Sequence, residues 1–338
     1  MTDRTAYSTM ADTSPVQMPP MEDALTIGRT EAGEEVLYNG ISRNSALSIC
    51  IPAYKDTADA LLSSLLHLKY VQHCTLLIYD DGSSDADLTK VLARQILRFP
   101  GPARLITADR NYGRSHARNR LISLAETDWI LFLDADMRPD SDGFISRYID
   151  AASNTHGPAL IPGGFSLKYA NPTDETRLHA AQSLKSECLS ADIRASQPGR
   201  YVFTSNILVH RDILASIRFD NRFKGWGWED VDWGLRVAQS YPVKHIDNTA
   251  THLGLDEDEV LLKKYGQSGS NFALALRQHP EALKATPLYR ASKFVSFLPG
   301  RRILKGLTRS VAKQHLLPIK LRLFALKLYR ASIYAEVV

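Results

Sequence analysis

The sequence predicts an α/β fold in which a mostly parallel central sheet is flanked by helices. Between residues 47 and 136, four apolar runs of β type alternate with stretches of helical spacing. Such alternation with short connections specifies right-handed βαβ crossovers within one sheet. The runs are continuously apolar, which indicates strands that are buried on both faces.

The elements follow one another in a regular order. Ala60, Leu61, Leu65 and Leu68 recur at helical spacing after the first strand, and a second helix is expected over 115–125. The expected strands are LSICIP (47–52), the start of TLLIYDDGSSD (75–85), ARLITAD (103–109) and WILFLDAD (129–136). Most of them end in polar or acidic residues. Because ligands of parallel sheets lie beyond the carboxyl ends of the strands, these residues are expected to converge on one crevice.

Length and composition indicate a globular protein. The chain has 338 residues, of which 44% are hydrophobic and 23% charged. It contains no run of eighteen apolar residues, and its first residues lack the pattern of a signal peptide. Cys50, Cys74 and Cys188 are few and widely separated, which predicts neither a disulfide framework nor a zinc site. These features favour the cytoplasm.

The chain is expected to divide into four parts, of which the last is strongly basic. These are an N-terminal extension that is partly disordered (1–44), a first half of the body (45–160), a second half (161–285) and a basic helical tail (286–338). The tail has eleven Lys or Arg against one acid, Glu336, about +10. Since the whole chain carries +4, the rest carries about −6, unlike a uniformly basic nucleic-acid-binding protein.

The last part of the tail is amphipathic from about Ile319. Its apolar face would hold Leu321, Phe324, Leu328 and Ala331, and its basic side Lys320, Lys327 and Arg330. Such a helix either lies on the inner face of an anionic membrane or docks its apolar face on the body of the protein. Both interpretations stay open.

Two acids end the fourth strand. Asp134 and Asp136 are separated by one residue and follow a buried strand. A solvated turn is the simpler interpretation, but two carboxylates at the mouth of a sheet repel each other unless a cation is present. Oxygen ligands that leave room for water and phosphate suit Mg²⁺ or Mn²⁺. The pattern therefore favours a divalent metal site.

Two further motifs offer contacts for a nucleotide. In DDGSSD (80–85), Asp81, with Asp80 as the alternative, is expected to accept from the imide N–H of uracil, while Ser83 or Ser84 caps the next helix. Tyr54 is a candidate to stack on the base. Arg118, near the start of a helix, is a candidate to pair with phosphate or is a solvated helix residue.

The motifs IPAYK (51–55), YDDGSSD (79–85), NYGRSHARN (111–119) and LDAD (133–136) together resemble the family-2 glycosyltransferases of GT-A fold, over about ninety residues. The resemblance implies a UDP-sugar donor, with nucleotide contacts by Pro52, Tyr54, Asp81, Arg118 and Asp134. It also implies Mn²⁺ or Mg²⁺ at Asp136, with Asp134 contacting the ribose or the metal. No G-x-G-x-x-G follows the first strand, which disfavours a dinucleotide-binding dehydrogenase.

A second motif, GWGWEDVDWGLR (225–236), is similar to the acceptor-side motif of β-1,4-galactosyltransferases and chondroitin-polymerase-like enzymes. The resemblance implies that Asp230 is the general base and that Trp226 stacks on a sugar. Glu229 would either orient the acceptor or support the site without contacting it. Gly227 would let the backbone approach the ligand. Trp228 is also expected at the sugar site, although it departs from a pattern that often has glycine. With both resemblances, 45–160 is the expected nucleotide-sugar-binding half and 161–285 the acceptor-binding and catalytic half. Asp232 and Arg236 have the i,i+4 spacing of a helical ion pair.

Two more residues complete the expected site. In related enzymes a histidine after the acidic motif completes the metal shell, which makes His252 the candidate and His245 its competitor. Gly164 in PGGF (162–165) is expected to line the donor sugar.

The expected activity is a metal-dependent transfer of a hexosyl or N-acetylhexosaminyl group to a glycan or lipid-linked glycan, with inversion. A retaining transferase, a nucleotidyltransferase and a non-catalytic glycan-binding protein are the alternatives.

Overall fold

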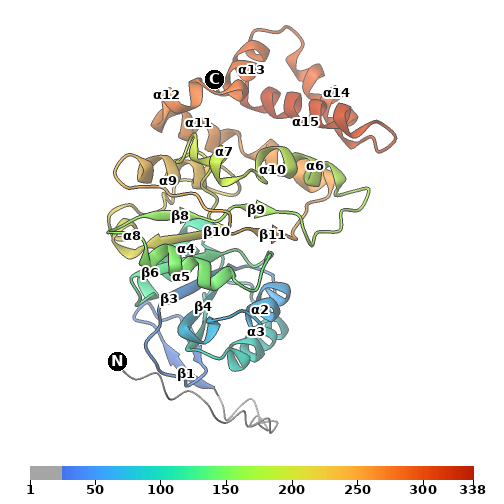
Figure 1. The fold of residues 1–338 in the computed structure, drawn as a ribbon. Coiled ribbons are helices and arrows are strands. Elements are labelled where there is room, and N and C mark those ends of the chain that lie inside the picture. Colours follow the sequence, from blue (N-terminus) through green and yellow to red (C-terminus); the bar gives the residue numbers. More distant parts are fainter. Residues whose placement is uncertain (1–24) are drawn as a thin grey trace.

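The computed structural model describes residues 25–338, and its centre is an eight-stranded sheet of order β1-β2-β5-β4-β3-β6-β10-β8 (Figure 1). Its strands are β1 (Thr26–Arg29), β2 (Glu35–Tyr38), β3 (Leu47–Ala53), β4 (Cys74–Asp80), β5 (Ala103–Thr107), β6 (Trp129–Leu133), β8 (Leu160–Pro162) and β10 (Asn206–His210). The middle strands β5, β4, β3 and β6 are parallel neighbours. Since β2 and β10 run antiparallel to their neighbours, the sheet is mixed, with a parallel core. The predicted α/β fold is confirmed.

The sheet opens where β3 leaves β6. β3 pairs with β4 along its whole length, as far as Ala53 opposite Asp80, but with β6 only from Ser48 to Cys50. Pro52 has no N–H to donate, so the ladder ends before it on that side. The carboxyl ends of β4, β3 and β6 therefore lie where β3 and β6 separate, which is the usual ligand position in such sheets.

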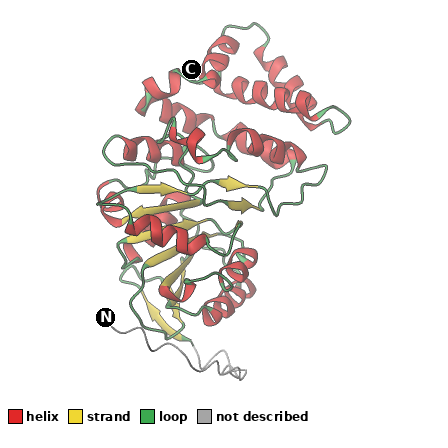
Figure 2. Cartoon of the chain, in the orientation of Figure 1, coloured by secondary structure: helices red, strands yellow, loops and turns green. Residues whose placement is uncertain are grey.

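Helices cover both faces of the sheet (Figure 2). One buried cluster joins the sheet to α2, α3 and α5, and the other joins it to α4, α8 and α9. Their bounds are α2 (Asp59–Leu65), α3 (Ala86–Arg98), α4 (Arg114–Leu124), α5 (Phe144–Ser153), α8 (Arg211–Ser216) and α9 (Glu229–Ala238), with a short 3-10 helix at Val71–His73. Burial on both faces explains why the parallel strands are continuously apolar.

A small second sheet lies beside the first. It has the order β7-β11-β9, with β7 (Met137–Pro139), β9 (Phe165–Ser166) and β11 (Ala250–His252). β11 pairs antiparallel with β7, so that His252 lies opposite Met137, the residue after Asp136. This pairing brings segments more than a hundred residues apart to the same edge of the molecule.

The C-terminal third is helical and gathers at the end of the molecule opposite β1 (Figure 1). The remaining helices are α6 (Arg177–Ser186), α7 (Ala191–Ala195), α10 (Asp258–Gln267), α11 (Gly269–Gln278), α12 (Pro280–Lys284), α13 (Pro287–Ser296), α14 (Arg301–Lys313) and α15 (Ile319–Tyr334). None of the helices within residues 25–338 has the length and apolar character required to cross a bilayer.

The helix α15 docks on the body of the protein. Leu323, Leu326, Tyr329 and Ile333 are buried in a third core cluster together with residues of α6, α10 and α11. The docked face is not the predicted apolar face. Of its four residues only Ala331 is buried, while Leu328 is half-buried and Leu321 and Phe324 are exposed.

The N-terminal residues differ from the expected extension. Within 1–44, β1 and β2 form a hairpin, and β2 adds to the edge of the main sheet by pairing with β5. Glu34, between these strands, accepts hydrogen bonds from Arg120 and Tyr79 and ties the hairpin to the body. The first part of the expected extension, residues 1–24, lies outside the described residues.

Candidate active site

The acids after β4 are held by different partners. Both carboxylate oxygens of Asp81 accept backbone N–H groups, from Tyr112 at 3.0 Å and Gly113 at 2.8 Å. Burial nevertheless raises the pKa of Asp81, against these two bonds. Asp80 accepts from Ser83 through one oxygen, and its buried Oδ2 has no hydrogen-bond partner among residues 25–338. Asp80, the alternative to Asp81, is therefore the acid with an oxygen left for a ligand.

This arrangement requires an unusual backbone. Gly82 has φ +72°, and a Cβ there would stand 2.1 Å from the backbone of Arg110. Lys55 and Ser84 also have positive φ, and the N–H of Lys55 donates to the Ser83 hydroxyl at 2.7 Å. Left-handed non-glycine residues are rare and concentrate at functional sites. The loops after β3 and β4 are thus locked together beside Tyr54, which is exposed.

Asp134 is paired with Arg118. The guanidinium Nη2 lies 2.9 Å from one carboxylate oxygen, and the hydroxyl of Ser205 donates to the other at 2.8 Å. Arg118 is only 2% exposed, and its Nε and Nη1 have no partner in the described part of the chain. Burial lowers its pKa, but the charges of Asp134, Asp230 and Glu229 outweigh burial and raise it. The positive charge of Arg118 therefore interacts with the acids of both motifs.

The side chain of Asp136 contacts His252 and not Asp134. Their side chains approach to 3.2 Å between Oδ2 and Nε2, because β7 and β11 pair. Burial raises the pKa of Asp136, but His252 lowers it more, and in return Asp136 raises the pKa of His252 against burial. His245, the competing histidine, lies between Arg194 at 2.8 Å and the carbonyl of Pro198 at 2.9 Å.

The predicted metal ligands are thus only partly assembled. Asp136 and His252 are in contact, while both oxygens of Asp134 are engaged by Arg118 and Ser205. Across residues 25–338, no three His, Cys, Asp or Glu side chains gather closely enough to form a metal site on their own. One carboxylate and one imidazole suit a cation that keeps water and phosphate oxygens as its other ligands. The residues present fit such an ion.

Asp230 lies in the first turn of α9, next to the sharp turn of the Gly-Trp motif. Gly225 and Gly227 have φ of +73° and +93°, and Trp228 precedes the helix at φ 76°. The carboxylate of Asp230 accepts from the Thr204 backbone N–H at 3.1 Å and from its hydroxyl at 2.8 Å. It is only partly buried, so it stays accessible to a ligand.

Thr204 and Ser205 join the two acidic motifs. Thr204 holds Asp230, and its neighbour Ser205 holds Asp134, just before β10. Asp134 and Asp230 are therefore bridged by two consecutive residues, and both act on Arg118. Thr204 and Ser205 were not among the predicted site residues. Two hydroxyl residues directly before an apolar strand, in FTSN (203–206), were the available signal.

Glu229 is buried beside Asp230. It is 6% exposed, its Oε2 has no hydrogen-bond partner among the described residues, and its Oε1 lies 3.9 Å from Arg114. Burial and the charge of Asp230 both raise the pKa of Glu229, against Arg114 and Arg118. Glu229 is thus a buried acid beside Asp230 with one oxygen free of hydrogen bonds within the described residues.

The aromatic residues of the motif have different surroundings. Trp226 is partly exposed and packs edge-on against Tyr265, with ring centroids 5.2 Å apart. The Trp228 indole donates to the hydroxyl of Tyr334 in α15 at 3.0 Å and contacts Phe272. Trp228 is therefore engaged by the C-terminal helices, whereas Trp226 retains surface for a ligand.

Gly164 lies further along the same edge. Its φ is +90°, and a Cβ there would stand 2.6 Å from the buried guanidinium of Arg194. Its carbonyl accepts from Asn206, the residue after Ser205. Contact of Gly164 with a donor sugar remains a prediction.

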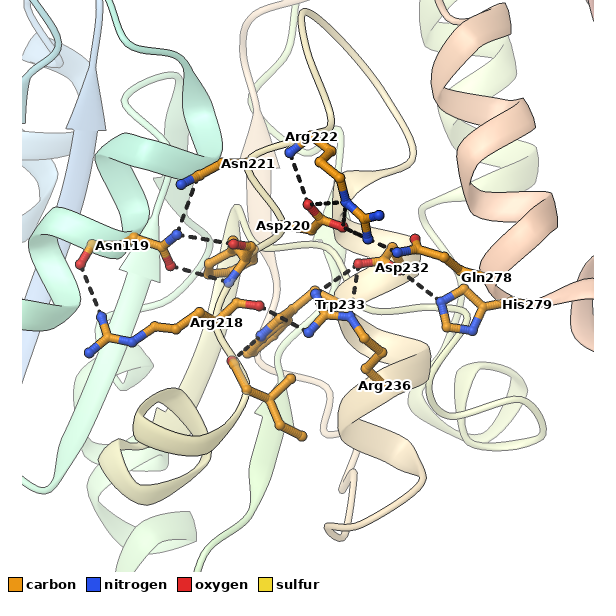
Figure 3. Close-up of polar contacts among 12 residues, drawn as sticks. Asn119, Arg218, Asp220, Asn221, Arg222, Asp232, Trp233, Arg236, Gln278 and His279 are labelled. Atoms are coloured by element: carbon orange, nitrogen blue, oxygen red, sulfur yellow. Dashed lines mark hydrogen bonds and ion pairs between the residues drawn. The ribbon is translucent and has the colours of Figure 1, made fainter.

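Asp232, the third acid of the motif, is fully buried in a polar network (Figure 3). Arg236 donates to its Oδ2 through Nε and Nη2 at 3.0 and 2.8 Å, which confirms the predicted i,i+4 pair. His279 lies 2.8 Å from its other oxygen. The network continues to the loop before α9, where Trp233 donates to the carbonyl of Ile217. Asp232 therefore anchors α9 and has no oxygen left for a ligand.

Comparison with curated proteins shows relatives in polysaccharide synthesis. The chain is 28% identical over 188 residues to the teichoic acid poly(glycerol phosphate) polymerase of Staphylococcus epidermidis, covering 55% of this chain and 24% of that one. It is 24% identical over 224 residues to the chondroitin synthase of Pasteurella multocida, covering 58% and 23%. The amylovoran biosynthesis glycosyltransferase AmsB of Erwinia amylovora is 27% identical over 192 residues, 54% of this chain and 60% of that one. The chain thus spans about a quarter of the length of the first two relatives.

Solved structures share the fold at low identity. Residues 1–349 of S. aureus TarS superpose with a TM-score of 0.50 and 16% identity, over 86% of this chain and 89% of that one. The mannosyltransferase PcManGT from Pyrobaculum calidifontis, in complex with GDP-Man and Mn²⁺, gives 0.55 and 12%, over 88% and 90%. These neighbours support the GT-A assignment.

The family follows from the sequence of the sheet-forming half. Residues 48–217, just over half of the chain, match the family model described as glycosyl transferase family 2. The match contains β3, β4 and β6 with the acids that follow them, and Thr204 and Ser205. The chain that carries these acids belongs to glycosyl transferase family 2.

Proposed function

We propose that the protein transfers a sugar from a UDP-sugar to a hydroxyl group of a glycan or lipid-linked glycan, with inversion, in the synthesis of a surface polysaccharide or glycoconjugate. The observation that carries the proposal is the bridge by Thr204 and Ser205. It supports a common site for the acid of the donor motif and the acid of the acceptor motif. Direct transfer to a hydroxyl needs one base opposite the leaving diphosphate.

Asp230 is the base in this proposal. Thr204 fixes its carboxylate by two hydrogen bonds, and lone pairs remain on its oxygens to accept the acceptor's proton. The exposed part of Trp226 provides an apolar face against which a pyranose ring packs. Glu229 stays behind Asp230 and adjusts the local charge rather than contacting the reacting oxygen.

The donor would lie across the ends of β3, β4 and β6. Tyr54 is exposed for stacking on the base, and the free oxygen of Asp80 supports a contact with the uracil imide N–H. Asp81 then supports the site by holding the loop before α4 through Tyr112 and Gly113. The unpartnered Nε and Nη1 of Arg118 are available to a phosphate oxygen.

Asp136 and His252 would hold the divalent ion. When bound, Mn²⁺ or Mg²⁺ supplies a positive charge that stabilises the diphosphate leaving group. Arg118 would complement it from the Asp134 side, since its guanidinium keeps its charge under burial. Asp134 positions Arg118 through their ion pair at 2.9 Å.

A donor screen tests the proposal. The protein is incubated with UDP-glucose, UDP-galactose, UDP-GlcNAc, UDP-GalNAc and GDP-mannose, with Mn²⁺, Mg²⁺ or EDTA, and the released nucleoside diphosphate is quantified. We expect release of UDP from at least one donor, stopped by EDTA. Release of GDP alone would contradict the uridine assignment, and unchanged release in EDTA would contradict the metal.

The stereochemistry is measured separately. Proton NMR of the first product formed from an α-linked UDP-sugar should show a β linkage if Asp230 acts as a base in a single displacement. An α-linked product would instead identify a retaining UDP-HexNAc-type transferase.

A further inference from the structure

The helices α13 and α14 follow each other through a short loop and both pack on α15, and their outer surface is both apolar and basic. Phe294, Phe297, Ile303 and Leu307 are 60–77% exposed. Arg290, Lys293, Arg301 and Arg302 are exposed in the same stretch. We call residues 290–307 the α13–α14 hairpin. Figure 1 shows it at the end of the molecule opposite β1.

The charges of this region divide into two sets. On α14, Lys305 pairs with Glu336 at 2.8 Å, and Lys313 pairs with Glu259 at 2.6 Å, so these cations are neutralised within the protein. Arg309, between them, also pairs with Glu259. In contrast, no acid among residues 25–338 pairs with Arg290, Lys293, Arg301 or Arg302. These four residues therefore give the hairpin a positive charge that no acid within the described residues neutralises.

The apolar residues lie away from the ion-paired row. Lys305, Arg309 and Lys313 follow each other at i,i+4 spacing, and Ile303 and Leu307 lie on the other side of α14. On α13, Val295 is buried, while Phe294 and Phe297 point outward, and the ammonium of Lys293 lies 5.2 Å from the ring centre of Phe297. Exposed phenylalanines next to unpaired cations are an arrangement that soluble surfaces usually avoid.

We propose that the α13–α14 hairpin binds the surface of an anionic lipid bilayer. Its cations match the negative headgroups, and its aromatic and aliphatic side chains reach the boundary between headgroups and acyl chains. The helix α15, for which membrane contact was one expectation, is mostly committed to the body through Leu323, Leu326 and Tyr329. The contact is thereby assigned to a different segment of the tail.

This inference rests on the proposed function only for the benefit of membrane binding, because a membrane contact would bring the site to lipid-linked acceptors. The binding itself does not depend on the activity. A failure of the donor screen would leave the hairpin's lipid binding intact, and a failure of lipid binding would leave UDP release intact.

Vesicle sedimentation of the full chain tests the proposal. The vesicles contain phosphatidylcholine alone or with phosphatidylglycerol. We expect the wild type to pellet with phosphatidylglycerol and to be released by salt. The double variant Phe294→Ser/Phe297→Ser should lose about tenfold or more in partitioning, and Arg301→Gln/Arg302→Gln about tenfold at low salt.

Matched variants keep the test decisive. Leu184→Ser/Ile193→Ser removes two similarly exposed apolar residues from α6 and α7 and should pellet like the wild type. UDP release and circular dichroism should be unchanged in all variants, since none contacts the site. Equal recovery of the wild type and the Phe294/Phe297 variant in the pellet overturns the proposal. Loss of pelleting only in Leu321→Ser/Phe324→Ser also overturns it, because that result would assign the contact to α15. If size-exclusion chromatography showed a wild-type dimer that the hairpin variants lose, that result would likewise overturn it and assign the surface to a second copy.

Discussion

The two halves of the site are held in place by different means. On the donor side, Asp80, Asp134 and Asp136 lie at or just after the ends of β4 and β6, so the parallel sheet places them at one edge. On the acceptor side, Asp230 follows a turn of left-handed residues and is held by Thr204. The donor side therefore depends on the core of the protein, whereas the acceptor side depends on individual contacts between loops and helices.

This difference has a consequence for substitutions. A side chain fixed by a sheet is difficult to misplace without unfolding, because its backbone is paired on both sides. A side chain fixed by two or three hydrogen bonds is misplaced by removing one of them. Conservative changes on the acceptor side should therefore separate activity from stability.

The largest effect is expected for Asp230→Asn. An amide cannot take up the acceptor's proton, so kcat should fall about 100- to 10,000-fold. The melting temperature and the affinity for UDP should be close to those of the wild type, because the substituted amide retains an oxygen that accepts from Thr204. Steady-state kinetics with the active donor and calorimetric titration of UDP measure both. Wild-type turnover would remove Asp230 from the role of base.

Asp232→Asn should lower stability and leave kcat nearly unchanged, the reverse of Asp230→Asn. Asp232 is fully buried between Arg236 and His279, and neutralising it leaves the Arg236 cation without its partner. Breaking such a pair costs about 3 kcal/mol of unfolding free energy. Urea denaturation should show this loss, while kcat of the remaining folded protein stays within about threefold of the wild type. A variant of normal stability and low kcat would show that Asp232, two residues from Asp230, belongs to the chemistry.

The difference between residues placed by the sheet and residues held by single contacts also explains which features could be predicted from the sequence. Continuous apolar runs followed by acids predicted the parallel strands, and the Asp232–Arg236 pair followed from helical spacing, because both are local patterns. The pairing of Asp134 with Arg118, in contrast, was not predicted, since both had been expected to bind the nucleotide. Thr204 and Ser205 reach acids 26 and 71 positions away. No periodicity encodes such contacts, which depend on where β10 enters the sheet.

Thr204→Val tests the bridge between the two halves. Valine has the shape of threonine but lacks the hydroxyl that donates to Asp230 at 2.8 Å, while the backbone N–H bond remains. A hydrogen bond to a charged group contributes about 1.5–3 kcal/mol, so kcat should fall about ten- to hundredfold. Ser205→Ala is the control on the donor side. Since Asp134 keeps Arg118, this variant should mainly raise KM for the donor. Equal effects of both variants on kcat and KM would contradict a division of the two roles.

The smallest effect is expected for Tyr334→Phe, the most distant residue of the acceptor side. Its hydroxyl accepts the Trp228 indole N–H at 3.0 Å across 106 residues, and the guanidinium of Arg330 lies 5.7 Å from the ring centre of Trp228. The variant keeps the ring stacked on Phe272 at 4.2 Å but loses the hydroxyl's hydrogen bonds to Trp228, Ser268 and Arg330. The bond to Trp228, which orients the residue before α9, contributes about 1 kcal/mol, so kcat should fall about fivefold. KM for the UDP-sugar and release of UDP to water should stay unchanged, because the donor side does not contact α15. Kinetics at saturating donor with varied acceptor measure transfer separately from the release of UDP to water. An equal loss of transfer and of UDP release would assign Tyr334 to general stability.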